Sequence, residues 1–509
     1  MKDRPTLAVC MIVKDESERL SNAIESVKEV ADQVIVVDTG STDNTVACAR
    51  SLGAYVVQYP WQDDFADARN RSLAEAECDW ILCLDADEYL VPESESALLK
   101  ALAGEAGGYM VRIESRVDSK AGRTFVNFFP RLFRNLEGIS FEGKVHEQVT
   151  QSIQRLGLPI EVSDIVIRHT GYALSGSDLK AKAQRNAALL LKEVEERPED
   201  ALVLFHLGEA YTMLERHGDA VDAYDRALLA GKLDRVVHGA LLQNKGAALV
   251  KLKAYEEALI ALRRAREVDS GLLTVHLVMA SALYAMKKYE RAEREVVSYI
   301  SMCREIERLK RLTLGHDPDI PNALVMLAKC RLAQGRLGGA REALEDALRL
   351  DRCEEGSSGG LGKGRYRPQG TGATGEAHVL LGKIAFEELK FGQAAAHFEE
   401  AVKTYPDEER VHFELARAYV ACGSNDRAIR TLEAAMREGM DSPDILRCLG
   451  VLKIKKKDFP GAIETYRRAL DVDPADVDSR KKLAGLYHAT GNSTTAEAIL
   501  NGTAASPPL

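Results

Sequence analysis

The sequence predicts an α/β domain with a mostly parallel sheet at the N-terminus, followed by an array built only of helices. Residues 6 to about 170 alternate short β-branched runs with amphipathic or polar segments, as α/β units do. From about residue 200 helical patterns recur at a fixed spacing. A chain of 509 residues with 46% hydrophobic content is long enough for two or three cores, which excludes a single-domain fold.

The clearest predicted strands of the first region are 7–13, 33–37, 54–58, 80–84 and 108–113. Between the first two strands, segment 16–30 places Leu20, Ile24 and Val27 on one helical face. This pattern predicts the crossover helix that two parallel strands require.

The helical region repeats a frame of six positions, which Leu207, Gly208, Tyr211, Ala220, Tyr224 and Ala227 fill first. The frame returns around Gly246, Met279, Leu327, Leu381, Leu415, Leu449 and Leu483, the last three spaced by 34 residues. Small residues let the two helices of a unit approach closely, and a bulky or aromatic residue fills the gap beside them. This is the signature of tetratricopeptide repeats.

Two inserts interrupt the period, and the predicted domain organisation follows from them. We expect an α/β domain (1–175), a connecting helix (176–200), repeat units 1–3 (201–300), a charged insert (301–320), unit 4 (321–353), a Gly/Ser-rich insert (354–375) and units 5–8 (376–509). The Gly/Ser-rich insert is expected to be a mobile loop or hinge, since it has too little apolar surface to bury.

Bulk properties narrow the class of partner and the compartment. The net charge of -10, with both signs interspersed, gives no electrostatic footprint for nucleic acid. The nine cysteines lack any C-x-x-C pair and are predicted to be reduced, mostly buried thiols. No apolar run reaches the roughly 18 to 20 residues that span a bilayer, so we expect no transmembrane segment and a cytoplasmic location.

The segment Asp85-Ala86-Asp87 follows an apolar strand, at the end where open α/β sheets bind ligands. In an extended chain the two aspartates would point to the same side and could hold Mg²⁺ or Mn²⁺. Charged turn residues also follow many strands without binding a metal.

A second loop, VDTGSTDNT, follows the strand at 33–37. Asp38 is placed to accept hydrogen bonds from a base or ribose, and Gly40 permits a tight turn. Ser41 or Thr42 is predicted to cap the helix that follows. A well-capped turn without a ligand is the alternative.

The order of MIVKDE, VDTGSTDNT, FADARN and LDADE resembles family 2 glycosyltransferases, over roughly residues 5 to 175. The resemblance implies a GT-A fold, a nucleotide-sugar donor and a metal on the D-x-D motif. It implicates Lys14, Glu16, Asp38, Arg69, Asp85 and Asp87 in binding the donor. It is closest to the subgroup that carries tetratricopeptide repeats, including bacterial peptide S-glycosyltransferases.

Three later segments match the same subgroup: FPRLFR, GKVHE and IRHTGY. The family inverts the anomeric centre, which requires a general base and stabilisation of the departing diphosphate. Glu147, with its neighbour His146, is the predicted catalytic pair, and Asp118 and Glu142 are the reserve bases. A solvated Glu147 that caps a turn is the alternative.

Two further groups are expected to act on the diphosphate. His169 ends a strand-like run and is predicted as a third metal ligand or a donor to the diphosphate, although a lone histidine in this place is often structural. Arg131 and Arg134 could steady phosphate oxygens, or belong to a solvated strand face.

The predicted function is a hexosyltransferase-type transfer, assisted by Mn²⁺ or Mg²⁺, from a UDP-sugar to a peptide or protein. The repeats are expected to bind protein partners, and a homodimer is open because repeat arms commonly pair. The alternatives are transfer to cell-surface saccharide or lipid-linked precursors, and an inactive scaffold that assembles partners.

Overall fold

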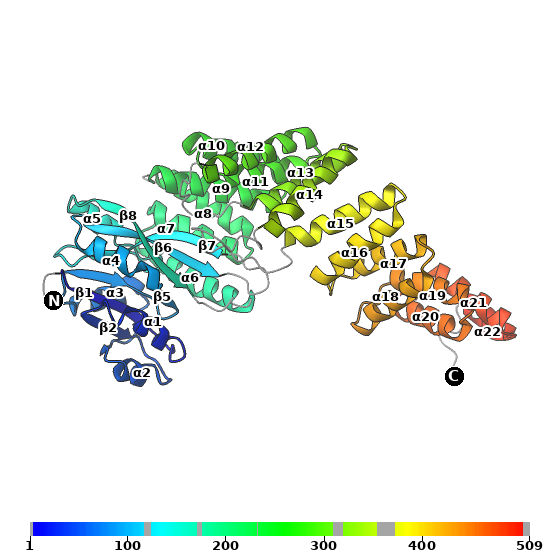
Figure 1. Ribbon diagram of the computed structural model, residues 1–509, viewed down its shortest axis with the longest axis horizontal. Helices are drawn as coiled ribbons and strands as arrows, with labels where there is room; N and C mark the ends of the chain where they lie inside the picture. The colour runs from blue at the N-terminus through cyan, green and yellow to red at the C-terminus, as the bar shows by residue number, and fades with distance from the viewer. Residues whose placement is uncertain are drawn as a thin grey trace. The chain divides into compact units, whose positions relative to one another are not determined.

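The computed structural model describes residues 4–116, 124–169, 176–231, 233–308, 319–353 and 372–501, and Figure 1 shows the course of the chain. It divides into two compact units, Met1–Ile320 and Pro321–Leu509. The first unit holds the α/β domain and three helix pairs of the repeat array. The predicted fold class, an α/β domain followed by a repeat solenoid, is confirmed.

The α/β domain is built on one eight-stranded sheet of order β3-β2-β1-β4-β7-β6-β8-β5. Its strands are β1 (Leu7–Val13), β2 (Gln33–Asp38), β3 (Tyr55–Gln58), β4 (Trp80–Cys83), β5 (Glu88–Leu90), β6 (Gly108–Arg116), β7 (Thr124–Arg134) and β8 (Ile160–His169). The first four strands in that order are parallel, as predicted. The other half is mixed, because β7 is antiparallel to both β4 and β6 and β5 is antiparallel to β8.

Both faces of the sheet are covered, and β1 shows the alternation that this requires. Leu7, Val9 and Met11 belong to a core shared with α1 and α4, whereas Ala8 and Cys10 belong to a second core shared with α3 and α5. The helices of this domain are α1 (Leu20–Val27), α2 (Thr45–Ser51), α3 (Phe65–Ala74), η1 (Pro92–Ser94), α4 (Glu95–Leu102) and α5 (Thr150–Arg155).

Helix α1 is shorter than the predicted 16–30, but it buries the predicted face. Leu20, Ile24 and Val27 are all buried. The residues before Leu20 instead form a loop at the carboxyl end of β1, which contributes to the candidate site.

A connecting helix, α6 (Gly176–Glu196), leads into eight helix pairs, one for each predicted repeat frame. The pairs are α7 (Ala201–Met213) with α8 (His217–Ala230), α9 (Arg235–Lys251) with α10 (Tyr255–Val268), α11 (Thr274–Ala285) with α12 (Tyr289–Arg308), α13 (Ile320–Ala333) with α14 (Leu337–Cys353), α15 (Gly372–Glu387) with α16 (Phe391–Thr404), α17 (Glu409–Ala421) with α18 (Asn425–Arg437), α19 (Pro443–Lys455) with α20 (Phe459–Val472), and α21 (Val477–Ala489) with α22 (Ser493–Leu500).

The two predicted inserts fall largely outside the described residues. Residues 301–308 of the charged insert continue α12, and its 309–318 are not among the residues described. Residues 354–371 of the Gly/Ser-rich insert also lie outside the described residues, while Gly372 already begins α15.

The turn within every repeat has the same backbone conformation. One residue of positive φ stands seven positions after the small residue of each frame, such as Gly208 or Gly246: Glu215, Lys253, Lys287, Gly335, Leu389, Gly423, Lys457 and Gly491. The next residue donates its N–H to the carbonyl five positions earlier, for example Arg216 to Tyr211 at 2.9 Å and Asn492 to Tyr487 at 2.8 Å. This is the hydrogen bond of a Schellman motif, which ends the first helix of each pair.

In three of the described units the small residue of the frame is a glycine that packs on an aromatic ring from the second helix. A Cβ on Gly208, Gly382 or Gly450 would lie 2.4 to 2.7 Å from the ring of Tyr224, Phe398 or Tyr466, respectively. Where leucine takes the second position, the first is alanine in Ala416 with Leu432 and Ala328 with Leu344, but glycine in Gly246 with Leu262. Glycine makes room for the ring in the three aromatic units.

The structure describes the side chains of eight of the nine cysteines, and all eight are free thiols. Cys10, Cys83, Cys303 and Cys330 are buried, while Cys422 is exposed. In the part of the chain that the structure describes, no helix is both long and apolar enough to cross a bilayer.

The pairing of glycine with an aromatic ring predicts the effect of one added methyl group. We expect Gly450→Ala to destabilise the second unit by about 1–3 kcal/mol, because the new Cβ overlaps the ring of Tyr466. The double variant Gly450→Ala with Tyr466→Leu recreates an alanine–leucine pair. Its free energy of unfolding should therefore be about 1 kcal/mol higher than the sum of the two single effects predicts. Chemical unfolding followed by circular dichroism measures both.

The matched control is Gly485→Ala, on a helix of the next repeat. A Cβ there meets no atom within 4 Å, so the change should be neutral or stabilise by up to about 1 kcal/mol. Equal destabilisation by the two substitutions would contradict the packing argument.

Candidate active site

The predicted ligand-binding residues follow three neighbouring strands of the sheet. Lys14 follows β1, Asp38 ends β2, and Asp85 comes shortly after β4. Because β1 lies between β2 and β4 and is parallel to both, these strand ends meet at one edge. Open α/β sheets bind ligands at this edge.

The loops after β1 and β2 are locked together by polar contacts. Asp15 has a φ of 54°, a conformation that Asp and Asn tolerate best. Its N–H donates to Ser41 Oγ at 2.9 Å, and its Oδ1 accepts from the Thr42 N–H at 2.6 Å. The Glu16 N–H donates to Thr45 Oγ1 at 2.8 Å. The two loops therefore form one wall of the site.

The Asp38 carboxylate is buried within its own turn. It is 2% exposed and accepts hydrogen bonds from the N–H groups of Gly40 and Ser41 at 3.2 to 3.3 Å. Gly40 has a φ of 110°, as the tight turn requires. These contacts support the turn role of Asp38, and its role toward a base or ribose stays a prediction.

The predicted capping of helix α2 by Ser41 or Thr42 is wrong. The helix begins only at Thr45, and Asp43 Oδ1 accepts from the Thr45 N–H at 2.9 Å. Ser41 and Thr42 lie too far ahead of the helix, and their side chains bind Asp15 instead.

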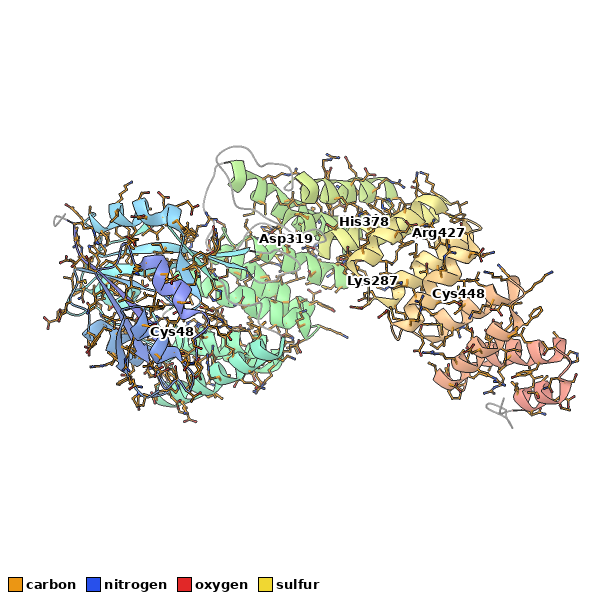
Figure 2. All side chains as sticks on the ribbon, turned by 60° about the horizontal axis from the view of Figure 1, so that its bottom comes forward. Cys48, Lys287, Asp319, His378, Arg427 and Cys448 are labelled. Carbon is orange, nitrogen blue, oxygen red and sulfur yellow. The ribbon has the colours of Figure 1, made fainter. Side chains whose placement is uncertain are left out.

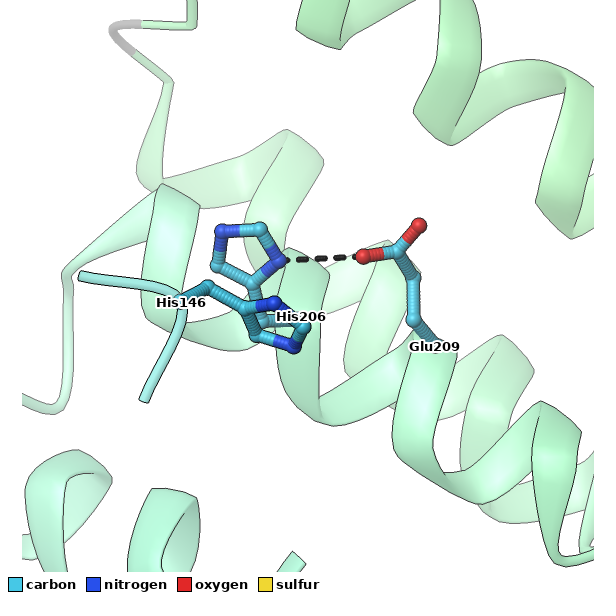
Figure 3. A group of neighbouring side chains, drawn as sticks. All are labelled: His146, His206 and Glu209. Atoms are coloured by element: carbon cyan, nitrogen blue, oxygen red, sulfur yellow. Dashed lines mark hydrogen bonds and ion pairs between the residues drawn. The ribbon is translucent and has the colours of Figure 1, made fainter. Parts of the chain in front are cut away.

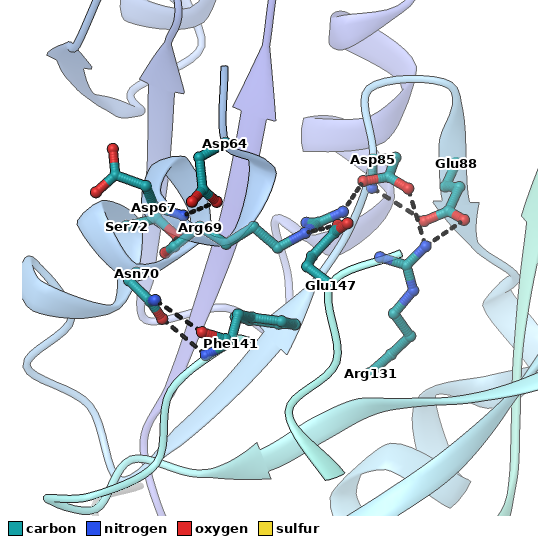
Figure 4. Close-up of polar contacts among 10 residues, drawn as sticks. All are labelled: Asp64, Asp67, Arg69, Asn70, Ser72, Asp85, Glu88, Arg131, Phe141 and Glu147. Carbon is teal, nitrogen blue, oxygen red and sulfur yellow. Dashed lines mark hydrogen bonds and ion pairs between the residues drawn. The ribbon is translucent and has the colours of Figure 1, made fainter. Parts of the chain in front are cut away.

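An alternating chain of acidic and basic side chains runs across the edge of the sheet (Figure 4). Arg69 of α3 donates from Nε to Glu147 Oε1 at 2.6 Å and from Nη2 to Asp85 Oδ1 at 2.8 Å. Arg131 of β7 donates from Nη2 to Asp85 Oδ2 at 2.9 Å and to Glu88 Oε1 at 3.0 Å. The order is Glu147, Arg69, Asp85, Arg131 and Glu88, so three carboxylates share two guanidinium groups.

Burial makes this chain of charges energetically demanding. The side chains of Arg69 and Glu88 are 7% and 3% exposed, whereas that of Asp85 is 34% exposed. Burial alone would raise the pKa of the Asp85 carboxyl, but the guanidinium groups of Arg131 and Arg69 outweigh it and hold that pKa well below its usual range. At Glu88 burial prevails and raises the pKa. Asp85, in the middle of this chain of charges, is therefore an ionised carboxylate that solvent reaches.

Asp87 and His169 lie beside this chain and face each other. His169 Nε2 is 3.0 Å from Asp87 Oδ2, and the two side chains are 33% and 24% exposed. The two residues meet because β5 pairs with β8 in a register that places Glu88 opposite His169. The hydrogen bond with Asp87 raises the pKa of His169.

The predicted metal ligands are thus close together without forming a complete set. Asp87 and His169 offer oxygen and nitrogen donors at one point, but both oxygens of Asp85 hold arginines. The turn after β4 separates the two aspartates, so they do not share the extended geometry that the sequence predicted. A divalent cation would have to replace the hydrogen bond between Asp87 and His169 and the contacts of Asp85 with Arg131 and Arg69, so metal binding at these residues stays a prediction.

The first-loop residues Glu16 and Lys14 differ in their surroundings. The Glu16 side chain is 27% exposed and bonds to Arg19, and burial, with a smaller contribution from Asp87, raises its pKa. Glu16 is therefore close enough to Asp87 for the two carboxylates to repel each other. Lys14 is exposed at the rim.

The strand register separates the two predicted phosphate-binding arginines. Trp80 at the start of β4 pairs with Arg134, which places Arg134 at the amino end of β4. Its guanidinium donates to the carbonyls of Ala106 and Gly104 and lies 4.6 Å from the Trp80 ring centroid. A phosphate role for Arg134 is therefore wrong, whereas Arg131 lies at the ligand edge.

The loop between β7 and α5 brings Glu147 back to the sheet. The side chain of Asn70 fixes its start, donating to the Phe141 carbonyl at 3.0 Å and accepting from the Phe141 N–H at 2.8 Å. Glu147 is 15% exposed, and its second oxygen has no partner among the described residues. Of the reserve bases, Glu142 pairs with Arg155, and Asp118 lies outside the described residues.

His146 has its contacts elsewhere. Its ring stacks on that of His206 in α7, with centroids 4.3 Å apart, and Val145 joins the hydrophobic core of the first repeat. His146 therefore contacts the repeat, while Glu147 joins the chain of charges.

Sequence reasoning missed Glu88, Asp15 and His206 as parts of these clusters. Glu88 stood within the LDADE segment, and an acidic residue directly after the D-x-D motif was the signal. Asp15 stood where the resembled family often has Asn. His206 lies in a repeat frame, where its neighbours gave no sign of a site.

Comparison with known protein families assigns the two regions. Residues 8–157 match the family described as Glycosyl transferase family 2. Residues 180–235, 306–353, 385–449 and 453–508 match tetratricopeptide repeats. The α/β domain is therefore a family 2 glycosyltransferase domain joined to tetratricopeptide repeats, which confirms the resemblance found in the motifs.

Individual relatives are named for one part or the other. The chain is 38% identical over 220 residues to a TPR repeat-containing protein of Synechococcus elongatus, covering 42% of this chain and 53% of the relative. It is 28% identical over 229 residues to the SPbeta prophage-derived glycosyltransferase SunS of Bacillus subtilis, covering 44% and 54%. An uncharacterized glycosyltransferase of Rickettsia bellii is 47% identical over 94 residues, covering 18% and 31%. The chain thus spans about half the length of the first two relatives.

The central arginine gives a stability prediction. Arg69→Met would leave the Asp85 and Glu147 carboxylates facing each other without their cation, so we expect a loss of about 3–5 kcal/mol. Urea unfolding followed by tryptophan fluorescence measures it, because the two tryptophans of the chain, Trp61 and Trp80, both lie in the α/β domain.

The matched control is Arg155→Met, which breaks a pair with Glu142 whose side chains are 58% and 38% exposed. Its cost should stay below about 1 kcal/mol. Similar costs for the two substitutions would mean that the chain of charges does not hold the domain together.

Proposed function

We propose that this protein transfers a sugar from a nucleotide-sugar donor, of the UDP-sugar class, to a peptide or protein acceptor with inversion at the anomeric carbon. The observation that carries the proposal is the chain of charges from Glu147 to Glu88 at the ligand-binding edge of a family 2 glycosyltransferase domain. This chain of charges contains guanidinium groups that can bind a leaving diphosphate and a carboxylate that can take the proton of an incoming acceptor.

Arg69 and Arg131 are the groups that bind the leaving diphosphate. Both guanidinium groups point at Asp85, whose carboxylate is the part of the chain that solvent reaches. A guanidinium fork matches phosphate oxygens as well as carboxylate oxygens. The diphosphate can therefore take over contacts that Asp85 holds in the structure.

Asp87, His169 and Asp85 would hold a divalent cation, Mn²⁺ or Mg²⁺. Asp87 and His169 already face one point, and Asp85 becomes available when its arginines turn to phosphate. When bound, such a cation neutralises charge that develops on the leaving diphosphate.

Glu147 is the proposed general base. The acceptor oxygen or sulfur attacks the anomeric carbon, and the bond from that carbon to the diphosphate oxygen breaks with its electron pair. The acceptor proton passes to the second carboxylate oxygen of Glu147. Arg69 positions this carboxylate through the 2.6 Å bond to its first oxygen. A single displacement of this kind inverts the anomeric centre.

A peptide acceptor is supported by the contact between the catalytic loop and the first repeat. Val145, two residues from Glu147, packs in the same core as Leu207 and Tyr211 of α7. Repeat solenoids present extended surfaces that suit peptides. An acceptor chain bound on the repeats can thus reach Glu147.

Two alternatives remain distinct in their predictions. Transfer to saccharide or lipid-linked precursors would leave peptides unmodified while a saccharide gains a sugar. A scaffold without activity would neither bind nor hydrolyse UDP-sugars. Mass spectrometry of candidate peptides with Ser, Thr or Cys, incubated with donor and Mn²⁺, tests the peptide acceptor. An assay of UDP-sugar binding and hydrolysis separates the other two functions.

The base assignment predicts the behaviour of Glu147→Gln. We expect kcat for sugar transfer to fall by about 10²- to 10⁴-fold, because glutamine cannot accept the proton. The Kd for the nucleotide sugar should change little, since the cations that bind the diphosphate remain. Steady-state kinetics and calorimetric titration of the donor measure the two quantities.

Glu137→Gln, at an exposed loop position of the same domain, is the control and should keep full activity. A large loss in Glu142→Gln combined with an active Glu147→Gln variant would move the base to Glu142. Full activity of both variants would refute a carboxylate base in this loop.

A further inference from the structure

Three metal-ligating side chains meet where the catalytic domain contacts the first repeat. His146 comes from the loop between β7 and α5, and His206 and Glu209 come from α7 (Figure 3). One ligand atom of each residue lies within 4.8 Å of the other two, and no other such group of three occurs in the described parts of the chain. Figure 2 shows the side chains of the described residues on the ribbon.

The two residues of α7 are preorganised on one helical face. His206 and Glu209 are three positions apart, a spacing that brings side chains together. His206 Nδ1 lies 3.0 Å from Glu209 Oε2. Asn244 of α9 donates to Glu209 Oε1 at 3.4 Å, which leaves Oε2 directed at the histidines. Such support from a second residue is typical of metal-ligating carboxylates.

Two properties of the histidines are not explained by the stacking of their rings. His206 Nε2 is buried and has no hydrogen-bond partner among the described residues. His146 holds a φ of 57°, which is uncommon for a non-glycine residue, and its ring stacks on that of His206. A buried imidazole nitrogen without a partner and a second imidazole 4.3 Å away form an incomplete donor set.

We propose that His146, His206 and Glu209 bind one borderline divalent cation of the Zn²⁺ class, which clamps the loop of Glu147 to the first repeat. Two imidazoles and a carboxylate suit Zn²⁺ and leave a fourth position for water. Bonds of about 2.0–2.1 Å place tetrahedral ligands roughly 3.4 Å apart. The ligand atoms now lie within 4.8 Å of one another, so the spacing must close by up to about 1.4 Å when the ion binds.

The ion has a path to this site. His146 and His206 line a cavity of about 390 Å³. Three acidic side chains on its wall are already paired, Glu193 and Asp200 with Arg197 and Glu142 with Arg155, so the cavity provides space for an ion to enter and the three proposed ligands provide the attraction. This site differs in all its residues from the one at Asp87 and His169, and it does not depend on the proposed sugar transfer.

Cobalt binding tests the proposal without donor or acceptor. The full chain is freed of metal with a chelator and titrated with Co²⁺ in an Asp87→Asn background, which disables the other candidate site. We expect one equivalent of Co²⁺ with the intense visible bands of tetrahedral coordination. Adding His206→Gln or Glu209→Gln should weaken this binding by at least about tenfold.

The controls keep the outcome unambiguous. Glu209 is 35% exposed and its change to glutamine preserves shape, so circular dichroism should show an intact fold. His488→Gln, at an exposed histidine of the last repeat, should bind Co²⁺ as the parent does. Zn²⁺ should raise the thermal midpoint of the parent more than that of Glu209→Gln. Equal Co²⁺ affinity with and without His206 and Glu209, or no binding in the parent, would overturn the site.

Discussion

The double salt bridge of Arg69 is the contact on which the arrangement of this domain depends. Its guanidinium is almost fully buried and is stable there only with carboxylates on both sides. One carboxylate comes from the turn after β4 and the other from the loop after β7, so three distant segments must converge. Arg69 thereby fixes where Asp85 and Glu147 lie relative to each other, which is the spacing between the donor and acceptor sides of the proposed site.

The same convergence links the catalytic domain to the repeats. The loop that delivers Glu147 to Arg69 is held at its start by Asn70 and continues through Val145, which packs among the repeat helices. His146 then turns onto His206. A shift of the first repeat can therefore move Glu147, the proposed base, because Val145 and His146, the two residues before it, contact the repeat. This short path connects the first repeat to the candidate site.

Much of the fold could be predicted from sequence, because it rests on local patterns. Strands β1 and β2 were found from short β-branched runs, and the repeat frames from the spacing of small and bulky residues. The site residues were found as strand-end polar residues and motif members. Their partners were not, because pairing depends on register. Arg131 and Arg134 are three positions apart on one strand, yet only the antiparallel pairing of β7 with β4 decides which one reaches the ligand edge.

Two other features were not predicted from the sequence, the turn within each repeat and the contacts of Ser41 and Thr42. The recurrent left-handed turn of the repeats is held by glycine in only some units, and Lys, Glu or Leu stands there in the others. The loop after β2 was expected to cap its helix with Ser41 or Thr42, but both serve Asp15 across the neighbouring loop. Contacts between loops from different strands leave no period in the sequence.

A structure of the chain with UDP and Mn²⁺ tests the central claim most directly. The account predicts the ion against Asp87, His169 and Asp85, the diphosphate on Arg69 or Arg131, and Glu147 facing the open side of the pocket. UDP bound elsewhere, or bound while Asp85 keeps both arginine contacts and no ion joins Asp87, would contradict it.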